Sequence, residues 1–282
     1  MSQRIRMLIN NIWDSATAAV TLGTEIASLP ITHTQKKGRS NTAVIVPSIT
    51  DTSVVEFDMP NFSFASAFVM YRHWLSNSAK VRLELYNESN QSGDLVYDSG
   101  LIDAVETKTF AEMNWFVDPL VASPFDNWPY RFTNLWFNRV FFKSGRLSIV
   151  DENARGNVHE IDRIFMGDVI KPDVNFAYGH EFAWRSDEEQ KRSVGGSVFT
   201  TEREKWREFS FDLNWITEAE RPLFSEAIRQ VSTSKDWFIS MYPESGGQKE
   251  MEYAMSCSFL SIPALNHNFH NNYNAKYSVR EV

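Results

Sequence analysis

Short stretches in which apolar and polar residues alternate run through much of the chain and predict β-strands. The segment 80–86 is the clearest example in the first half, because its apolar residues point to one side of a strand and its charged residues to the other. The segment 66–71 is apolar nearly throughout, as expected for a strand covered on both faces. In the second half, the segments 207–215 and 251–259 alternate in the same way. The pattern predicts a mainly β protein.

One segment departs from this pattern and predicts an α-helix over residues 217–231. Thr217 and Glu220 have the spacing of a capping box, in which each side chain bonds the other residue's backbone N–H. Apolar residues then recur at helical spacing up to Val231. Pro222 lies deeper in the segment than proline prefers, so we expect the start of the helix to be shifted or distorted.

The turn-rich segment 145–196 divides the chain into two β-rich parts. A preceding stretch, 101–139, holds three Trp and three Pro residues and predicts a long loop with a functional or capping role. We therefore expect an N-terminal docking segment, a jelly-roll-like β-sandwich and a second β domain bearing the helix. The expected bounds are 1–27, 28–165 and 166–282.

Composition excludes several classes of protein. A formal net charge of −8 and a pI near 5.3 argue against a surface that binds nucleic acid, whether or not the binding is sequence-specific. The single cysteine, Cys257, excludes an internal disulfide framework. No apolar run is long enough to span a bilayer, and the first residues lack the apolar core of a secretory signal. We therefore expect neither a nucleic-acid partner nor a membrane partner.

No motif in the chain carries recognisable catalytic chemistry. His267 and His270 lack the spacing and partner ligands of a zinc site, and the segment 151–156 lacks the spacing and distal Glu of an EF-hand. Carboxylates are plentiful, but nothing in the sequence pairs two of them across a cleft, so we rank a glycan-cleaving enzyme last. We expect no catalytic residue, no metal and no cofactor.

A group of aromatic residues in the long predicted loop is the most informative candidate for binding. Aromatic faces stack on sugar rings, so this group could bind a glycan. The same residues could instead hold the loop over the sandwich or fill a subunit interface, where Trp and Tyr are enriched, and we favour this second interpretation. The residues are Trp115, Trp128, Tyr130 and Trp136.

Several short motifs resemble those of bacteriophage distal-tail and baseplate proteins. In that family an Arg-Ile-Phe-x-Gly strand connects a jelly-roll module to a tube-like module, and the segment 163–167 has this pattern. The polar segment 187–196, which ends in Gly-Gly, resembles the loop that follows. Residues 97–100 (Tyr-Asp-Ser-Gly) resemble a turn of the galactose-binding-like jelly roll in these proteins, and Ala79 and Arg82 match its adjoining strand. Trp74 replaces the Asn of the turn before that strand.

The resemblance implies a structural role in the virion tail, assembled in the host bacterial cytoplasm. The chain would form a homo-oligomeric ring that joins the tail tube protein to baseplate hub or receptor-binding proteins, and the second domain would be tail-tube-like. Closing a ring would cover strand edges that otherwise aggregate. A carbohydrate-binding jelly roll that recognises a cell-surface glycan is the alternative function. The candidate subunit contacts are Phe209, Phe211, Trp215, Phe224, Ile228, Tyr253 and Phe259.

Overall fold

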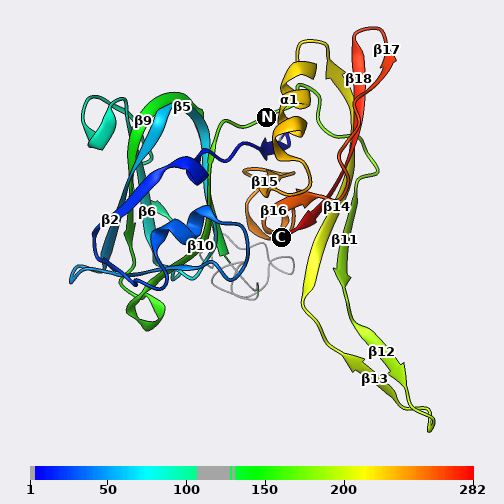
Figure 1. Cartoon of the computed structure of the whole chain (residues 1–282), viewed down its shortest axis with the longest axis horizontal. Coiled ribbons are helices and arrows are strands. Elements are labelled where there is room, and N and C mark those ends of the chain that lie inside the picture. The colour runs from blue at the N-terminus through cyan, green and yellow to red at the C-terminus, as the bar shows by residue number, and fades with distance from the viewer. Residues whose placement is uncertain (1–3, 107–127, 129–130) are drawn as a thin grey trace, which may run out of the picture. The chain divides into compact units, whose positions relative to one another are not determined.

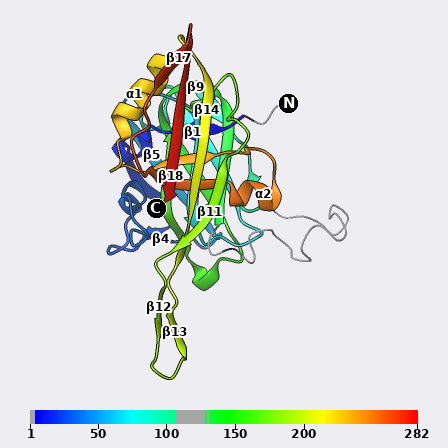
Figure 2. The same ribbon diagram turned by 90° about the vertical axis from the view of Figure 1, so that its right-hand side faces the viewer.

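The structure is a computed structural model, and it describes residues 4–106, 128 and 131–282. The chain is mainly β, as the alternation predicts, and it forms two compact units (Figures 1 and 2). Unit 1 comprises Met1–Lys171 and Trp237–Met255, and unit 2 comprises Pro172–Asp236 and Ser256–Val282. The chain therefore leaves unit 1, builds most of unit 2, returns to unit 1 and ends in unit 2. The expected division into consecutive segments does not include this return.

The antiparallel sheet of unit 1 is built around two long strands, β5 and β9. Its strand order is β3-β4-β10-β5-β9-β6-β7, with β2 on β5 and β8 on β6. Two 3-10 helices, Ile12–Ser15 and Ile31–Gln35, lie on either side of β2 and β3 in the chain. The strands are β2 (Thr17–Leu22), β3 (Thr24–Glu25), β4 (Ala43–Val46), β5 (Thr52–His73), β6 (Lys80–Tyr86), β7 (Leu95–Asp98), β8 (Ile102–Asp103), β9 (Arg131–Val150) and β10 (His159–Gly167).

β5 and β9 run through both halves of the sheet, so that a single sheet provides both layers of a jelly-roll-like sandwich. Residues 52–58 of β5 pair with β2 on one side and with the end of β9 on the other. Residues 67–73 pair with β10 and with the start of β9. Irregularities in the register between Asp58 and Ser63, and again between Ala65 and Ala67, separate the halves. The predicted N-terminal jelly-roll-like sandwich is confirmed.

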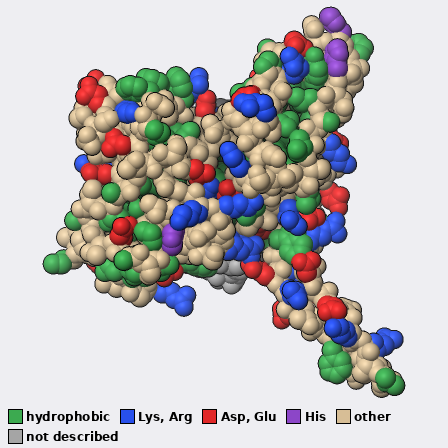
Figure 3. All heavy atoms as spheres, viewed as in Figure 1, with side chains coloured by type: hydrophobic (Ala, Val, Ile, Leu, Met, Phe, Trp, Pro, Cys, Tyr) green, Lys and Arg blue, Asp and Glu red, His purple; other side chains and the backbone are tan. Residues whose placement is uncertain are grey.

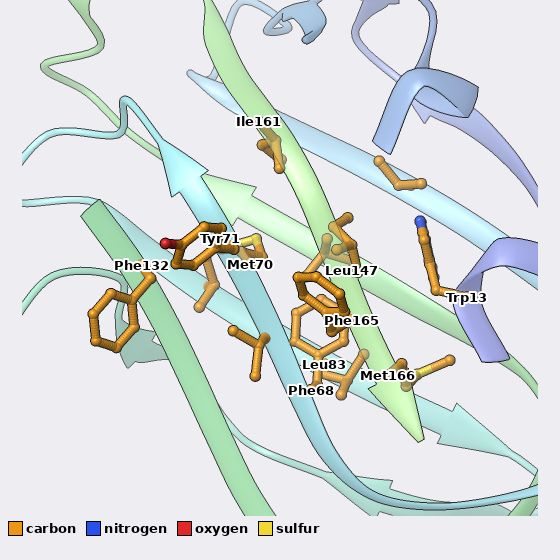
Figure 4. Packing of buried hydrophobic residues seen from close by; sticks show 14 of the residues in the cluster. Trp13, Phe68, Met70, Tyr71, Leu83, Phe132, Leu147, Ile161, Phe165 and Met166 are labelled. Atoms are coloured by element: carbon orange, nitrogen blue, oxygen red, sulfur yellow. The ribbon is translucent and has the colours of Figure 1, made fainter. Parts of the chain in front are cut away.

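The core of unit 1 draws side chains from both halves of this sheet. Figure 4 shows Leu83 and Leu147 from one half beside Phe68 and Phe165 from the other, and all four are fully buried. Residues 65–71 of β5 are buried without alternation, which confirms the prediction of a strand covered on both faces. Burying large apolar side chains in this way contributes roughly 1.5–3 kcal/mol for each.

The outer face of β5 and β10 is covered by β1 (Arg6–Leu8), β15 (Trp237–Ser240) and their connections within unit 1. β1 pairs antiparallel with β15, with Met7 opposite Ile239. Phe238 packs against rings from three strands of the main sheet: its centroid is 6.0 Å from those of Tyr71 and Phe165 and 6.2 Å from that of Phe132. A short helix, α2 (Gly247–Glu252), follows. β15 and α2 are thus separated in sequence from the other elements of unit 1.

The N-terminal segment is an integral part of unit 1. Trp13 is fully buried, and its ring packs edge-on against Phe57 with centroids 5.0 Å apart. Its Nε1 donates a hydrogen bond of 2.9 Å to Thr34 Oγ1. Trp13 thereby joins the first 3-10 helix to the second and to β5.

Unit 2 contains an antiparallel sheet and one α-helix. The sheet order within the unit is β16-β18-β14-β11, with β17 on β18, and β12 and β13 form a separate ladder. β16 begins in the last residues of unit 1 and pairs with β18 through Cys257–Phe259. The elements are β11 (Glu181–Ser186), β12 (Glu189–Arg192), β13 (Val198–Thr201), β14 (Lys205–Thr217), α1 (Arg221–Val231), β16 (Ala254–Phe259), β17 (Asn266–Phe269) and β18 (Asn272–Glu281).

The predicted capping box forms, but it precedes the helix instead of beginning it. Glu220 Oε2 accepts hydrogen bonds from the N–H and the hydroxyl of Thr217, at 2.9 and 2.8 Å. Thr217 itself belongs to the end of β14, and α1 starts at Arg221, so Pro222 falls in the first turn, where its missing N–H costs little. The helix start is shifted toward the C-terminus, as Pro222 led us to expect.

Two predicted elements were wrong. The stretch 101–139 was expected to be irregular to its end, but its described final part belongs to β9, which begins at Arg131. The alternating segment 251–259 was expected to be one strand, but residues up to Glu252 form α2 and only Ala254–Phe259 form β16. β16 is buried on both faces, so its alternating small polar residues do not mark a solvent side.

A buried ion pair joins β14 to β18 in unit 2. Arg207 Nε and a terminal guanidinium nitrogen donate to the carboxylate of Glu281 at 3.0 and 2.8 Å. The Arg207 backbone N–H donates a third bond, of 3.1 Å, to the same carboxylate. The Arg207 side chain is 0% exposed and that of Glu281 is 2% exposed, so the pair replaces much of the solvation that each charge has in water.

Candidate functional site

A hollow of unit 1 that combines aromatic and charged residues has a volume of about 560 Å³. Strands β7 and β9 supply its aromatic wall, and β1 and the segments around residues 171 and 244 supply its charges. The hollow is lined by Arg6, Val96, Tyr97, Trp136, Phe137, Asn138, Val140, Lys171 and Glu244. We call it the Tyr97 hollow.

Two aromatic rings from neighbouring parts of the sheet are already stacked in the wall of the Tyr97 hollow. The centroids of Tyr97 and Phe137 are 4.1 Å apart with an angle of 22° between their planes. Tyr97 is held in place because β7 pairs with β6, with Tyr97 opposite Leu85. Both rings are half-buried, so they present a fixed surface that need not reorganise to accept a ligand.

A third aromatic residue in the wall, Trp136, is covered by a cation. The Arg6 guanidinium lies over the Trp136 ring, 4.8 Å from its centroid. The same guanidinium forms two short contacts with Glu244, of 3.0 and 2.9 Å. Arg6 is therefore fixed in orientation by an ion pair and by a ring at once.

Lys171 contributes a second cation to the Tyr97 hollow. Burial, together with the positive charge of Arg6, lowers the pKa of the Lys171 ammonium below its usual range. Among the described residues no carboxylate forms an ion pair with Lys171. Asp168, the nearby carboxylate, pairs with Arg139 at 2.8 Å instead.

A smaller hollow of about 310 Å³ lies beside β8 and the start of β9 and has an acidic lining. Its two glutamates hold the start of α2 in place: Glu106 accepts a bond of 2.6 Å from Gly247 N–H, and Glu250 accepts one of 3.0 Å from Gly246 N–H. Asn134 also donates to Glu250 at 2.5 Å. These carboxylates are engaged in positioning the backbone, so we assign them a structural role.

His73, near this smaller hollow, is a buried neutral histidine. Thr133 donates its hydroxyl hydrogen to the Ala104 carbonyl, so His73 Nε2, which is 2.8 Å from Thr133 Oγ1, acts as the donor to it. Burial, aided by the charge of Arg131, lowers the pKa of His73 from 6.5 to about 3. The folded protein therefore resists binding a proton that the unfolded chain accepts below pH 6.5.

This difference predicts that His73 makes the protein less stable as the pH falls from 6.5 toward 3. In that range the unfolded state binds one more proton, at a cost of about 1.4 kcal/mol per pH unit. His73→Gln cannot titrate, so we expect its free energy of unfolding to fall by about 2 kcal/mol less than wild type between pH 7 and pH 5. Guanidinium unfolding at both pH values measures this. His270→Gln, at an exposed turn, should retain the wild-type pH dependence, and equal pH dependence in the His73 variant would contradict the prediction.

The structure places the predicted aromatic residues in different surroundings. Trp136 lines the Tyr97 hollow and packs against the core, and Trp128 is half-buried and packs against the core. Trp115 and Tyr130 lie outside the described residues. Tyr97 and Phe137 were not predicted as site residues. Both lie in segments whose sequence favours a strand and close to residues typical of turns.

Most of the predicted subunit contacts serve the fold of this chain. Phe209, Phe211, Phe224 and Phe259 are each no more than 3% exposed. Ile228 is half-buried, as is Tyr253, whose ring contacts Tyr242 with centroids 5.1 Å apart. Only Trp215, at 60% exposure, offers a large apolar surface.

The projecting hairpin β12–β13 of unit 2 exposes apolar residues that the sequence analysis did not single out. All residues of both strands are exposed, and Figure 3 shows hydrophobic side chains toward its tip. Val194 and Phe199 are the most exposed large apolar residues of the hairpin, at 110% and 64%. The turn closes through a bond of 2.8 Å from Ser193 N–H to the Ser197 carbonyl. Residues 187–196 had been expected to form a polar loop, yet β12 lies within them.

No group of three or more His, Cys, Asp or Glu side chains among the described residues is arranged to hold a metal ion. None of the helices in this part of the chain has the length and apolar character required to cross a membrane.

Comparison with known proteins yields similar structures but no family. No protein-family profile matches the chain, and no curated protein does. A chitosan-binding module of a chitosanase/glucanase from Paenibacillus sp. IK-5 is 9% identical, with a TM-score of 0.38 over 56% of this chain and 98% of the module. A Clostridium perfringens module solved with GalNAc-β-1,3-galactose is also 9% identical, with a TM-score of 0.38 over 56% of this chain and 99% of its own.

A Streptococcus pneumoniae fucose-binding module is 8% identical, with a TM-score of 0.36 over 56% of this chain and 94% of that chain. These neighbours are described as sugar-binding modules, and none of the three is described as a tail protein. Scores this low carry no argument about what this chain binds.

Proposed function

We propose that this chain is a non-catalytic structural component of a bacteriophage tail tip or baseplate, in which copies assemble into a ring between the tail tube and the hub or receptor-binding proteins. The observation that carries this proposal is the exposed hairpin β12–β13 of unit 2. A two-stranded hairpin with no covering layer is marginally stable in water, and its exposed Val194 and Phe199 favour burial against a partner. The motif at residues 163–167 supports the same family resemblance.

Other features of unit 2 support assembly through this unit. β11 is the last strand in the sheet order, so its outer backbone groups are open to pairing with another strand. Trp215 adds an exposed aromatic anchor on β14. The buried residues of β14 and α1 give these surfaces a rigid support.

The location of the protein tests the tail assignment. Antibody raised to this chain is applied to purified phage particles from the source and followed by immunogold electron microscopy. Label confined to the tail tip is expected. Particles without label, with the protein free in the lysate, would overturn the proposal.

Sedimentation of the purified chain tests the assembly step. We expect the wild-type chain to form a closed oligomer and Phe199→Asp to remain monomeric, because the substitution places a charge in the buried contact. Phe269→Asp is the matched control, since Phe269 is an equally exposed phenylalanine of unit 2 (75%) on a different strand. Loss of assembly in both variants, or in neither, would contradict a role for the hairpin.

A second candidate function is glycan binding by unit 1 at the Tyr97 hollow. The stacked rings of Tyr97 and Phe137, the polar Asn138 and the volume of about 560 Å³ favour it. A glycan array probed with the full chain and with Tyr97→Ala tests this function. Binding that is lost in the variant is expected, and the absence of any bound glycan would exclude it. The two functions are compatible, because one rests on unit 2 and the other on unit 1.

A further inference from the structure

We infer that the ligand of the Tyr97 hollow is a saccharide that bears a single carboxylate, and that Lys171 binds this carboxylate. The inference rests on the second candidate function, glycan binding by unit 1, and specifies the class of sugar. The supporting observations are the charges that line the hollow and the aromatic surface beside them.

One cation among the described residues of the lining forms no ion pair. Arg6 and Lys171 are the described cations there, and Glu244 is the described carboxylate. Glu244 is held by Arg6 through two contacts of 3.0 and 2.9 Å. Asp168 is held by Arg139. Lys171 is therefore the described cation of the lining that forms no ion pair, although the charges of Glu244 and Asp168 also act on its ammonium group.

This balance favours a ligand with one negative charge. An anion placed at Lys171 also lies in the field of Arg6, whose positive charge already acts on the Lys171 ammonium. Glu244 would repel a ligand that carries two negative charges more strongly than one that carries a single charge. A carboxylate fits this requirement and forms charge-assisted hydrogen bonds with an ammonium group.

The aromatic wall favours a sugar ring over a simple acid. Arg6 covers Trp136, so the stacked pair of Tyr97 and Phe137 is the aromatic surface left for a ligand. The apolar C–H face of a pyranose suits such a surface, and Asn138 is an exposed amide that can bond to hydroxyl groups. A hollow of about 560 Å³ lies within the size range of small-molecule sites and exceeds the volume of a simple acid.

Two sugars that differ only at one carbon test the inference. Binding of methyl β-glucuronide, which carries a carboxylate, is compared with binding of methyl β-glucoside by titration of the full chain monitored by NMR. We expect roughly tenfold tighter binding of the glucuronide, which corresponds to one charge-assisted hydrogen bond. Lys171→Met should reduce this ratio to about one, and Lys171→Arg should retain it.

Control measurements separate this inference from the function on which it rests. Lys191→Met removes an equally charged residue from the exposed hairpin and should leave the ratio unchanged. Equal binding of both sugars, or a preference that survives Lys171→Met, would overturn the inference while leaving glycan binding intact. If acetate binds as tightly as the glucuronide, the site accepts carboxylates without a sugar, and the saccharide class is wrong. If neither these sugars nor any glycan of an array binds, both the inference and the glycan-binding function fall.

Discussion

Glu281→Gln is expected to lower the free energy of unfolding by about 3–5 kcal/mol, as for other buried ion pairs that lose one partner. The substitution keeps the size of the side chain but removes the carboxylate charge that pairs with the Arg207 guanidinium, which is 0% exposed. The backbone N–H of Arg207 also loses a charged acceptor. Chemical unfolding followed by circular dichroism measures the change.

The matched control replaces both partners. Arg207→Met combined with Glu281→Leu removes both buried charges, and we expect it to recover most of the stability lost in the single variant. The exposed pair of Glu226 and Arg229 on α1 gives the contrast, since Arg229→Ala removes a surface ion pair and should lower the free energy of unfolding far less than Glu281→Gln. If Glu281→Gln were as stable as wild type, the prediction would be contradicted, and groups other than Glu281 would have to stabilise the charge of Arg207.

Trp13→Ala is expected to cost about 3–5 kcal/mol, in the range found for large aromatic residues removed from a core. Trp13 is fully buried, packs edge-on against Phe57 and bonds to Thr34, so its loss leaves a cavity and an unpaired hydroxyl acceptor. The midpoint of thermal unfolding and the free energy from denaturant titration both measure the effect.

Two variants distinguish packing from other causes. Trp13→Phe keeps an aromatic ring beside Phe57 and loses the Nε1 bond to Thr34, so it should cost clearly less than Trp13→Ala. Trp74→Ala removes a tryptophan that is 39% exposed and should also cost less. If Trp13→Ala proved as mild as Trp74→Ala, the burial of Trp13 would contribute little to the stability of unit 1, and the prediction would be wrong.

Local sequence patterns predicted the elements whose environment is set by near neighbours. The alternation of 80–86 predicted β6, and the unbroken apolar run of 66–71 predicted a strand buried on both faces. The capping box and Pro222 predicted a helix with a displaced start. In each case the periodicity of one element carries the information, because side chains on one strand or helix face share one environment.

The candidate site could not be predicted in the same way. Arg6, Tyr97 and Lys171 come together only when β1, β7 and the end of the first segment of unit 1 meet. The apolar positions of β14 and α1 were predicted as contacts with a neighbour, and residues such as Phe209 instead fill the chain's own core. Amphipathic patterns show that one face is buried but do not show what buries it. The segment 251–259 was wrongly predicted as one strand because Met251 and Glu252 continue the alternation of β16, yet they form the end of α2.

The path of the chain between the units has a consequence for the order of events during synthesis. The ribosome completes residues 172–236, most of unit 2, before it makes β15, which pairs with β1. Until Phe238 emerges, the rings of Tyr71, Phe132 and Phe165 lack the side chain that covers them in the finished unit. A nascent chain that stops after Lys171 therefore exposes an aromatic surface that is prone to aggregation. Chaperone binding is most useful to this protein during the translation of unit 2.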